Sequence, residues 1–220
     1  MTERVVVVVA GGESPRPSAA RAVPSGATVI AADAGLEHAT ALGLDVSVAV
    51  GDFDSASPDA VAEAEARGVR IVRHPAAKDA TDLELALDEA SGLHPSRILV
   101  LGGIGDRLDH LLSLLLLLAA PRLEDVAAVD AIVGDARIHV VRSERALAGE
   151  PGELVSLLAL HGRTEGVRTN GLAYPLAGET LEPGSSRGVS NVLTASEARV
   201  SVEHGVLVAI FPGRGDEEAT

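Results

Sequence analysis

Two aspartates stand one residue apart in the stretch GDFDS, where Asp52 and Asp54 directly follow an apolar run. Carboxylates this close repel each other, so the pair needs solvent or a cation to compensate its charge. The apolar run before them is typical of a buried strand, which places both side chains just beyond the strand's carboxyl end. Asp52 and Asp54 are therefore candidate ligands of a hard divalent cation.

Other aspartates follow apolar runs in the same way. Asp33 comes after TVIAA, Asp79 and Asp82 come after VRIVR, and Asp106 and Asp109 come after RILVL. The carboxyl ends of parallel strands form the edge at which open α/β sheets bind ligands. Aspartates gathered at that edge predict a Mg²⁺ site, and Mg²⁺ in proteins usually keeps substrate phosphates among its ligands. Taken alone, Asp33 is also explained as a helix cap and Asp82 by a helix dipole.

Lys78 is the only lysine of the chain, and it directly precedes Asp79. The sequence otherwise uses arginine for its positive charges. This one lysine therefore indicates a site that needs a compact ammonium, for example to contact a phosphate. The alternative is a surface lysine without a function.

The segment GGIGDRLDH has the composition of an anion-binding turn. Gly102 and Gly103 offer backbone N–H groups ahead of a helix, and Arg107 can donate two hydrogen bonds to phosphate oxygens. His110 is a candidate general acid or base, although a histidine on a helix is more often structural. Ser55 is given little weight as a nucleophile, because no His–Asp relay is evident.

The elements that position these residues alternate between strand and helix. Two helices carry start signals: Ser57 with Pro58, and Thr81 with Glu84 in a capping box. A leucine-rich helix over 109–119 is apolar all round and is expected to be buried. The pattern predicts an α/β fold with a doubly wound, mostly parallel sheet and helices on both faces. The predicted strands are 4–9, 27–32, 47–50, 69–73, 97–101 and 127–133.

The residue pattern of the sequence changes from about residue 138. Short β-like runs are then separated by Gly and Pro, with no helical period. These signals predict a small antiparallel β domain at the C-terminus. We expect a catalytic domain over 1–145, a second domain over 146–214 and a flexible tail over 215–220.

Composition narrows the classes of function. The formal net charge of −14 disfavours nucleic acid as a partner, and the absence of Cys excludes disulfides and thiolate chemistry. The longest apolar run is far shorter than the ~20 residues that a membrane-spanning helix needs. The sequence thus predicts a soluble, cytoplasmic protein without a membrane or nucleic-acid partner.

The motifs in their order resemble the thiamine pyrophosphokinase family, especially its bacterial form. The resemblance covers essentially the whole chain. It is carried by AADAG (31–35), VGDFDS (50–55), KDATDLELAL (78–87), GGIGDRLDH (102–110), TNGLAYPL (169–176) and SRGVSN (186–191).

The resemblance implies an α/β catalytic domain, a C-terminal β-sandwich and a homodimer with active sites at the subunit interface. It also implies the reaction, in which the pyrophosphoryl group of ATP passes to the hydroxyl of thiamine and gives thiamine diphosphate and AMP. Some relatives stack thiamine on a tryptophan. This chain has none, which leaves Tyr174 or a neighbouring subunit for that contact.

Roles for individual residues follow from the resemblance. Asp79 or Asp109 is expected to accept the proton of the thiamine hydroxyl. The implied Mg²⁺ ligands are Asp33, Asp52, Asp54 and Asp82, with Asp79 close by. The implied phosphate contacts are Lys78, Arg107, Gly102 and Gly103, and His110 is a further residue of the nucleotide site. The implied contacts to the thiamine ring are Ser190 and Asn191.

Three alternatives remain open on the sequence. A pyrophosphokinase for another primary alcohol, such as a hydroxymethylpterin, has the same catalytic half. A Mg²⁺-dependent phosphohydrolase also uses an Asp-x-Asp pair, although there the pair normally follows the first strand. A non-catalytic thiamine diphosphate-binding protein has less need of the full set of carboxylates.

Overall fold

Every apolar run predicted as a strand in the first two thirds of the chain is a strand in the computed structural model, which describes residues 4–105 and 107–213. Asp106 and the tail over 215–220 lie outside the described residues. The strands are β1 (Val5–Val9), β2 (Thr28–Ala32), β3 (Val46–Gly51), β4 (Arg70–Arg73), β5 (Arg97–Gly102) and β6 (Ala128–Val133).

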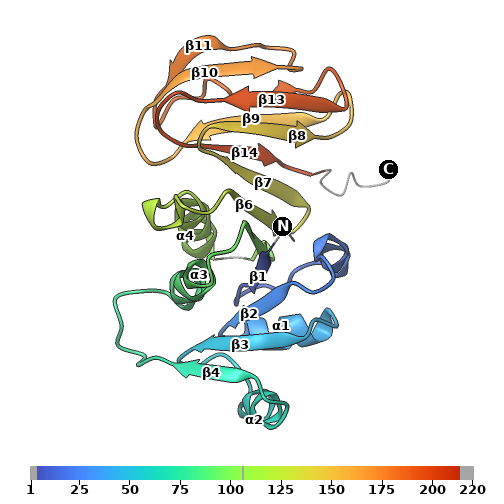
Figure 1. Ribbon diagram of the computed structural model, residues 1–220, viewed down its shortest axis with the longest axis vertical. Coiled ribbons are helices and arrows are strands. Elements are labelled where there is room, and N and C mark those ends of the chain that lie inside the picture. Colours follow the sequence, from blue (N-terminus) through green and yellow to red (C-terminus); the bar gives the residue numbers. More distant parts are fainter. Residues whose placement is uncertain (1–3, 106, 214–220) are drawn as a thin grey trace. The chain divides into compact units, whose positions relative to one another are not determined.

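These six strands form a parallel sheet in the order β6-β5-β1-β2-β3-β4 (Figure 1). The order changes direction between β1 and β5, and ligands of open α/β sheets bind outside the strand ends near such a point. The doubly wound parallel sheet predicted from the sequence is thereby confirmed.

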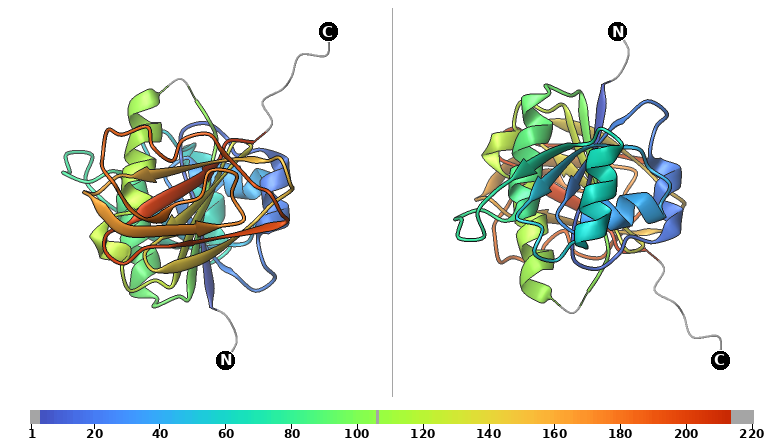
Figure 2. Two further views of the ribbon diagram at one scale, coloured as in Figure 1. Left: turned by 90° about the horizontal axis from the view of Figure 1, so that it is seen from above. Right: turned by 90° about the horizontal axis from the view of Figure 1, so that it is seen from below.

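Helices cover both faces of this sheet (Figure 2). α1 (Gly35–Ala41) and α2 (Pro58–Ala66) pack with alternate residues of β1 to β3 on one face, and α3 (Asp82–Gly92) contacts the same strands. The start signals were read correctly, since Ser57 Oγ accepts the Ala60 N–H (3.4 Å) and Thr81 Oγ1 accepts the Glu84 N–H (3.2 Å). Short 3-10 turns occupy Pro17–Ala22 and Pro121–Leu123.

The leucine-rich helix α4 (Leu108–Leu118) is only half buried, which corrects the expectation of a helix buried all round. Leu114 and Leu118 are buried, whereas Leu108 is 73% exposed, Leu112 is 53% exposed and Leu116 is 37% exposed. The exposed leucines are four residues apart and therefore share one stripe of the helix. None of the described helices is long and apolar enough to cross a membrane.

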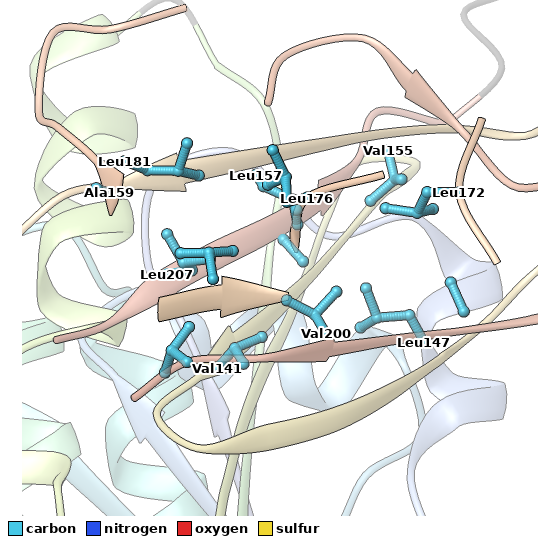
Figure 3. Packing of buried hydrophobic residues seen from close by; sticks show 14 of the residues in the cluster. Val141, Leu147, Val155, Leu157, Ala159, Leu172, Leu176, Leu181, Val200 and Leu207 are labelled. Atoms are coloured by element: carbon cyan, nitrogen blue, oxygen red, sulfur yellow. The ribbon is translucent and has the colours of Figure 1, made fainter. Parts of the chain in front are cut away.

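The C-terminal strands pair antiparallel in two layers, in the orders β12-β9-β14-β7 and β11-β10-β13-β8. Inward-facing side chains of both sheets make one aliphatic core (Figure 3). The expected antiparallel β-sandwich is confirmed. The strands are β7 (Ala136–Val141), β8 (Glu144–Ala148), β9 (Leu154–Ala159), β10 (Thr164–Asn170), β11 (Ala177–Leu181), β12 (Asn191–Val192), β13 (Glu197–Ser201) and β14 (Leu207–Phe211).

The chain divides into two compact units between Gly134 and Asp135, with residues 118–124 joining the second unit. This division precedes the expected boundary at 145/146. The reason is that β7 pairs antiparallel with β14, the last strand of the chain, so β7 belongs with the C-terminal sheets.

Candidate active site

Three aspartates from two neighbouring strand ends come together in the first unit. Asp33 follows β2, Asp52 and Asp54 follow β3, and one carboxylate oxygen of each lies within 4.8 Å of the others. The parallel pairing of β2 with β3, with Ala32 opposite Val50, brings the two loops to one edge of the sheet. The arrangement offers three hard oxygen ligands, which suits Mg²⁺.

The backbone of these loops takes unusual conformations. Asp33 has φ 48° and Phe53 has φ 59°, in the left-handed region that non-glycine residues rarely adopt. The Asp33 N–H donates to Val50 O (2.9 Å), which fixes the end of β2 against β3. Gly51 is packed closely against this backbone, since a Cβ on it would lie 3.3 Å from Asp33 Cα and 3.2 Å from Asp82 Oδ1. Strained residues of this kind concentrate at functional sites.

Asp33 is the most buried of the three, with 8% of its surface exposed. Burial raises the pKa of its carboxyl group, opposed in part by hydrogen bonds from Ala34 N–H and Ser55, and the nearby charges of Asp82 and Asp54 raise it further. Its Oδ1 atom is buried with no hydrogen-bond partner among the described residues. It does not cap α1, whose N-cap is Ala34 without a side-chain capping bond. A bound cation would satisfy this oxygen.

Lys78 connects the aspartates of β3 with the start of α3. Its Nζ lies 2.7 Å from Asp52 Oδ2 and 2.9 Å from Asp82 Oδ1, and only 13% of the lysine side chain is exposed. The hydrogen bond from Lys78 lowers the pKa of Asp52. Burial acts to lower the pKa of Lys78, but Asp52 and Asp82 together outweigh it and raise that pKa. The lysine is thus a fixed cation of the site and not a surface residue.

The glycine-rich turn after β5 packs against Glu13 and Ser14 of the loop after β1, for which the sequence predicted no role. Gly103 donates its N–H to Glu13 O (3.0 Å), and a Cβ on Gly103 would lie 2.5 Å from Ser14 O. This N–H is therefore engaged within the fold, whereas a Cβ on Gly102 would make only ordinary contacts with Leu114 Cδ1 (3.7 Å) and Ala10 Cβ (3.8 Å). The loop after β1 was recognisable only from the Gly11-Gly12 pair at a strand end.

Arg107 and Asp109 form a two-pronged pair on the exposed start of α4, with Nε–Oδ1 at 2.9 Å and Nη2–Oδ2 at 2.7 Å. The Arg107 hydrogen bonds hold the pKa of Asp109 well below its usual range. In this geometry Asp109 is a weak base. Asp79 is exposed in the loop before α3, and His110 is exposed on α4.

The residues expected to contact an acceptor lie in the second unit. Ser190 is exposed, has φ 56° and donates its N–H to Ser156 Oγ (3.1 Å). Asn191 is 3% exposed, and its side-chain amide bonds the backbone of Tyr174. Tyr174 itself is 68% exposed. The sequence did not reveal the link between Asn191 and Tyr174, because it joins two distant segments.

A hollow of about 820 Å³ also lies in the second unit, beside Gly149–Leu154. Its charged residues include Arg137 and Glu153, which bond each other at 2.7 Å. The hollow offers no feature that matches the carboxylate chemistry above, so we assign it no part in the site.

The chemistry available in the first unit is the binding of a cation and an anion together. Three carboxylates follow the ends of two neighbouring strands, and the largely buried ammonium of Lys78 contacts Asp52. No Cys exists in the chain. This arrangement suits phosphoryl-type transfer, in which the protein chiefly positions the reactants and stabilises charge.

Two family models match the chain in succession. Residues 20–135 match the model described as "Thiamin pyrophosphokinase, catalytic domain", and residues 135–207 match "Thiamin pyrophosphokinase, vitamin B1 binding domain". A thiamine pyrophosphokinase of Bacillus subtilis is 27% identical over 191 residues, which cover 80% of this chain and 85% of that protein.

Solved structures agree in fold. The crystal structure of thiamine pyrophosphokinase from Bacillus subtilis has a TM-score of 0.81 at 25% identity and covers 96% of this chain and 100% of its own. The yeast thiamin pyrophosphokinase has a TM-score of 0.74 at 15% identity, with 96% and 86% covered, and at that identity the likeness concerns the fold alone.

Proposed function

We propose, from the premise that this chain belongs to the thiamin pyrophosphokinase family, that it transfers the pyrophosphoryl group of ATP to the hydroxyl of thiamine. The products are thiamine diphosphate and AMP. The observation that carries the proposal is the cluster of Asp33, Asp52 and Asp54 beside Lys78, because a Mg²⁺–polyphosphate substrate needs both an oxygen-rich cation site and a compact ammonium.

The residues of the cluster fit Mg²⁺. Asp33, Asp52 and Asp54 would hold it, with Asp82 adjoining through Lys78, and the unsatisfied Asp33 Oδ1 gives the cation a ready ligand. Bound there, Mg²⁺ neutralises charge on the phosphates of ATP.

In the reaction the hydroxyl oxygen of thiamine bonds to the β-phosphorus of ATP. The bond from that phosphorus to the oxygen shared with the α-phosphate breaks, and this oxygen leaves with AMP. Lys78, Arg107 and Gly102 contact the phosphates, and His110 adjoins the nucleotide. The Gly103 N–H is donated to Glu13 O and takes no part in this contact. Asp79 accepts the hydroxyl proton, since Arg107 lowers the basicity of Asp109 in the structure.

Thiamine binds in the second unit. Ser190 and Tyr174 are exposed there within the segment matched by the vitamin B1 binding model. Tyr174 takes the place of the tryptophan that some relatives use, because it is the only tyrosine and the chain has no Trp.

We further propose that the protein is a cytoplasmic homodimer. The exposed stripe of Leu108, Leu112 and Leu116 on α4 is the surface proposed for the second copy. An apolar stripe of this kind on a helix is stabilised when a matching stripe covers it.

The test is to mix the purified protein with Mg²⁺-ATP, with and without thiamine, and to measure AMP and thiamine diphosphate. We expect both products in equal amounts, dependent on thiamine. Asp54→Asn should lower turnover at least about 100-fold, since it removes a cation ligand. Asp59→Asn is the matched control, because Asp59 is exposed in the first turn of α2 and should keep wild-type turnover.

Other outcomes identify the alternatives. AMP or phosphate without a thiamine product would indicate a phosphohydrolase. Turnover with a hydroxymethylpterin but not with thiamine would indicate a pyrophosphokinase for another alcohol. Binding of thiamine diphosphate without any turnover would indicate a binding protein.

A further inference from the structure

Tyr174 is presented to solvent by a segment whose two ends are buried. It lies between Leu172 and Leu176, which are each 6% exposed and belong to the core of the sandwich (Figure 3). Tyr174, two residues from each, is 68% exposed. The two buried leucines fix the segment on either side of Tyr174. They do not fix the backbone of Tyr174 itself, which needs other contacts.

The side chain of Asn191 holds that backbone. Its Oδ1 accepts the Tyr174 N–H (3.0 Å) and the Val192 N–H (2.9 Å), and its Nδ2 donates to Tyr174 O (2.7 Å). Both backbone polar groups of Tyr174 are thus satisfied by one buried amide. The orientation of the amide follows from these partners, because only its nitrogen can donate to a carbonyl.

Further bonds close the segment on either side. The Ala173 N–H donates to a carbonyl of β12 (2.8 Å), and the Leu176 N–H donates to Thr169 Oγ1 (2.8 Å). Pro175 restricts the residue before it to extended conformations. A single conformation of the backbone at Tyr174 is therefore strongly favoured, and Asn191 supplies the bonds at its centre.

We infer that Asn191 is a positioning residue, which fixes the backbone of Tyr174 so that the phenol ring faces the acceptor. Both lone pairs of its oxygen are used and only 3% of the residue is exposed. The preference of the site for one acceptor ring over another then depends on Asn191, because Asn191 sets the position of Tyr174. As regards thiamine, the inference rests on the proposed function.

The clamp can be tested without any ligand. Tyr174 is the only tyrosine and there is no tryptophan, so the tyrosine fluorescence of the intact protein reports this one position. Asn191→Asp replaces the donor to Tyr174 O by an oxygen, and we expect a lower fluorescence anisotropy from a more mobile ring.

Thr164→Val is the matched control for that measurement. Thr164 is fully buried in the same unit, and its hydroxyl donates to Val206 O (2.9 Å) without touching Tyr174. This variant removes a buried hydrogen bond and should keep the wild-type anisotropy. Equal anisotropy in Asn191→Asp and the wild type would overturn the inference.

Kinetics give a second, independent test. Asn191→Asp should raise KM for thiamine about tenfold, with KM for ATP and kcat within about twofold, because a ring contact made equally in ground and transition states affects KM alone. Tyr174→Ala should give a similar rise, and the double variant should add little to either single variant.

Additive effects of the two substitutions would mean that Asn191 acts independently of Tyr174, and would overturn the inference. An equal rise of KM for ATP would do the same, since it would indicate general damage. If the wild type shows no turnover with thiamine, the proposed function fails, whereas the ligand-free anisotropy still decides whether Asn191 fixes Tyr174.

Discussion

Asp33 illustrates how a functional carboxylate can lower the stability of the fold that contains it. The group is buried, has an unsatisfied oxygen and stands in a left-handed backbone conformation. Its raised pKa means that the folded state disfavours the ionised form, so at neutral pH the charge of Asp33 opposes folding. The proposed cation site would give this charge a function.

Asp33→Asn should therefore stabilise the metal-free protein at pH 7 by about 0.5–2 kcal/mol while it weakens cation binding. Urea unfolding measures the first effect and a Mn²⁺ titration followed by electron paramagnetic resonance measures the second. Asp59→Asn, in the exposed first turn of α2, should change neither. A destabilised Asp33→Asn protein would instead favour a structural role for this carboxylate.

Lys78 should contribute to stability within a defined range of pH. The pKa of Asp52 is lowered. The contribution of Asp52 to the stability of the fold is therefore complete when the pH is above the ordinary pKa of 3.8, and it is lost as the pH falls below that value. The pKa of Lys78 is raised, so its contribution is complete below its ordinary value of 10.5 and is lost as the pH rises through the raised one. The pair is therefore fully effective near neutral pH.

Lys78→Met should lower the free energy of unfolding of the metal-free protein by about 1–3 kcal/mol at pH 7, because two carboxylates lose their partner. The difference from the wild type should shrink at pH 3, as measured by urea unfolding at both values. Arg199→Met is the control: its ion pairs with Glu144 and Glu197 are exposed and should contribute no more than about 0.5 kcal/mol. A pH-independent difference would refute the role of the ion pairs.

At the scale of elements, α1 approaches the end of β1 so closely that only glycine fits. A Cβ on Gly35 would lie 2.2 Å from Val9 O, which is backbone and cannot move aside. The contact sets the position of α1, and Leu36 N–H in turn donates to Asp33 O. The placement of the helix and that of the carboxylate are thus coupled.

Gly35→Ala should destabilise the protein by about 2 kcal/mol or more, since the helix must shift away from the sheet. Gly92→Ala is a matched control at the end of α3, where nothing lies within 4 Å of the added Cβ and the helix should tolerate it. Urea midpoints of the two variants provide the comparison. Similar midpoints would show that α1 can move without penalty.

The elements were predictable from the sequence where their signals are local. The caps at Ser57 and Thr81 and the apolar runs of the strands depend on neighbouring residues, and all of them formed as expected. The exposure of Leu112 could not be predicted, because a helix that is apolar all round does not indicate which of its sides lacks a neighbour.

The site was predictable to the same degree. Strand ends indicated the aspartates near β2 and β3, but the bond from Lys78 to Asp52 is a contact across 26 residues of sequence. The bonds from Asn191 to Tyr174 span 17 residues between two irregular segments. Such contacts have no local pattern, so the sequence did not predict that the Asn191 side chain bonds the backbone of Tyr174.

At the scale of the whole molecule, the proposed homodimer depends on the exposed stripe of α4. Leu112→Glu places a charge in the middle of that stripe and should convert a dimer to a monomer in sedimentation velocity. Leu154→Glu is the matched control, because Leu154 is also exposed (46%) but lies in the second unit. Dimers that persist in Leu112→Glu would show that another surface joins the copies.

The central position of β1 has a consequence for synthesis on the ribosome. β1 is five consecutive valines and is translated well before β5, which pairs with one of its edges and begins only at Arg97. Until β5 has been translated, a fully apolar strand keeps an open hydrogen-bonding edge, and such edges recruit strands of other chains. The interval between these two strands is therefore when the nascent chain most needs a chaperone, and chains terminated before β5 are the ones most prone to aggregate.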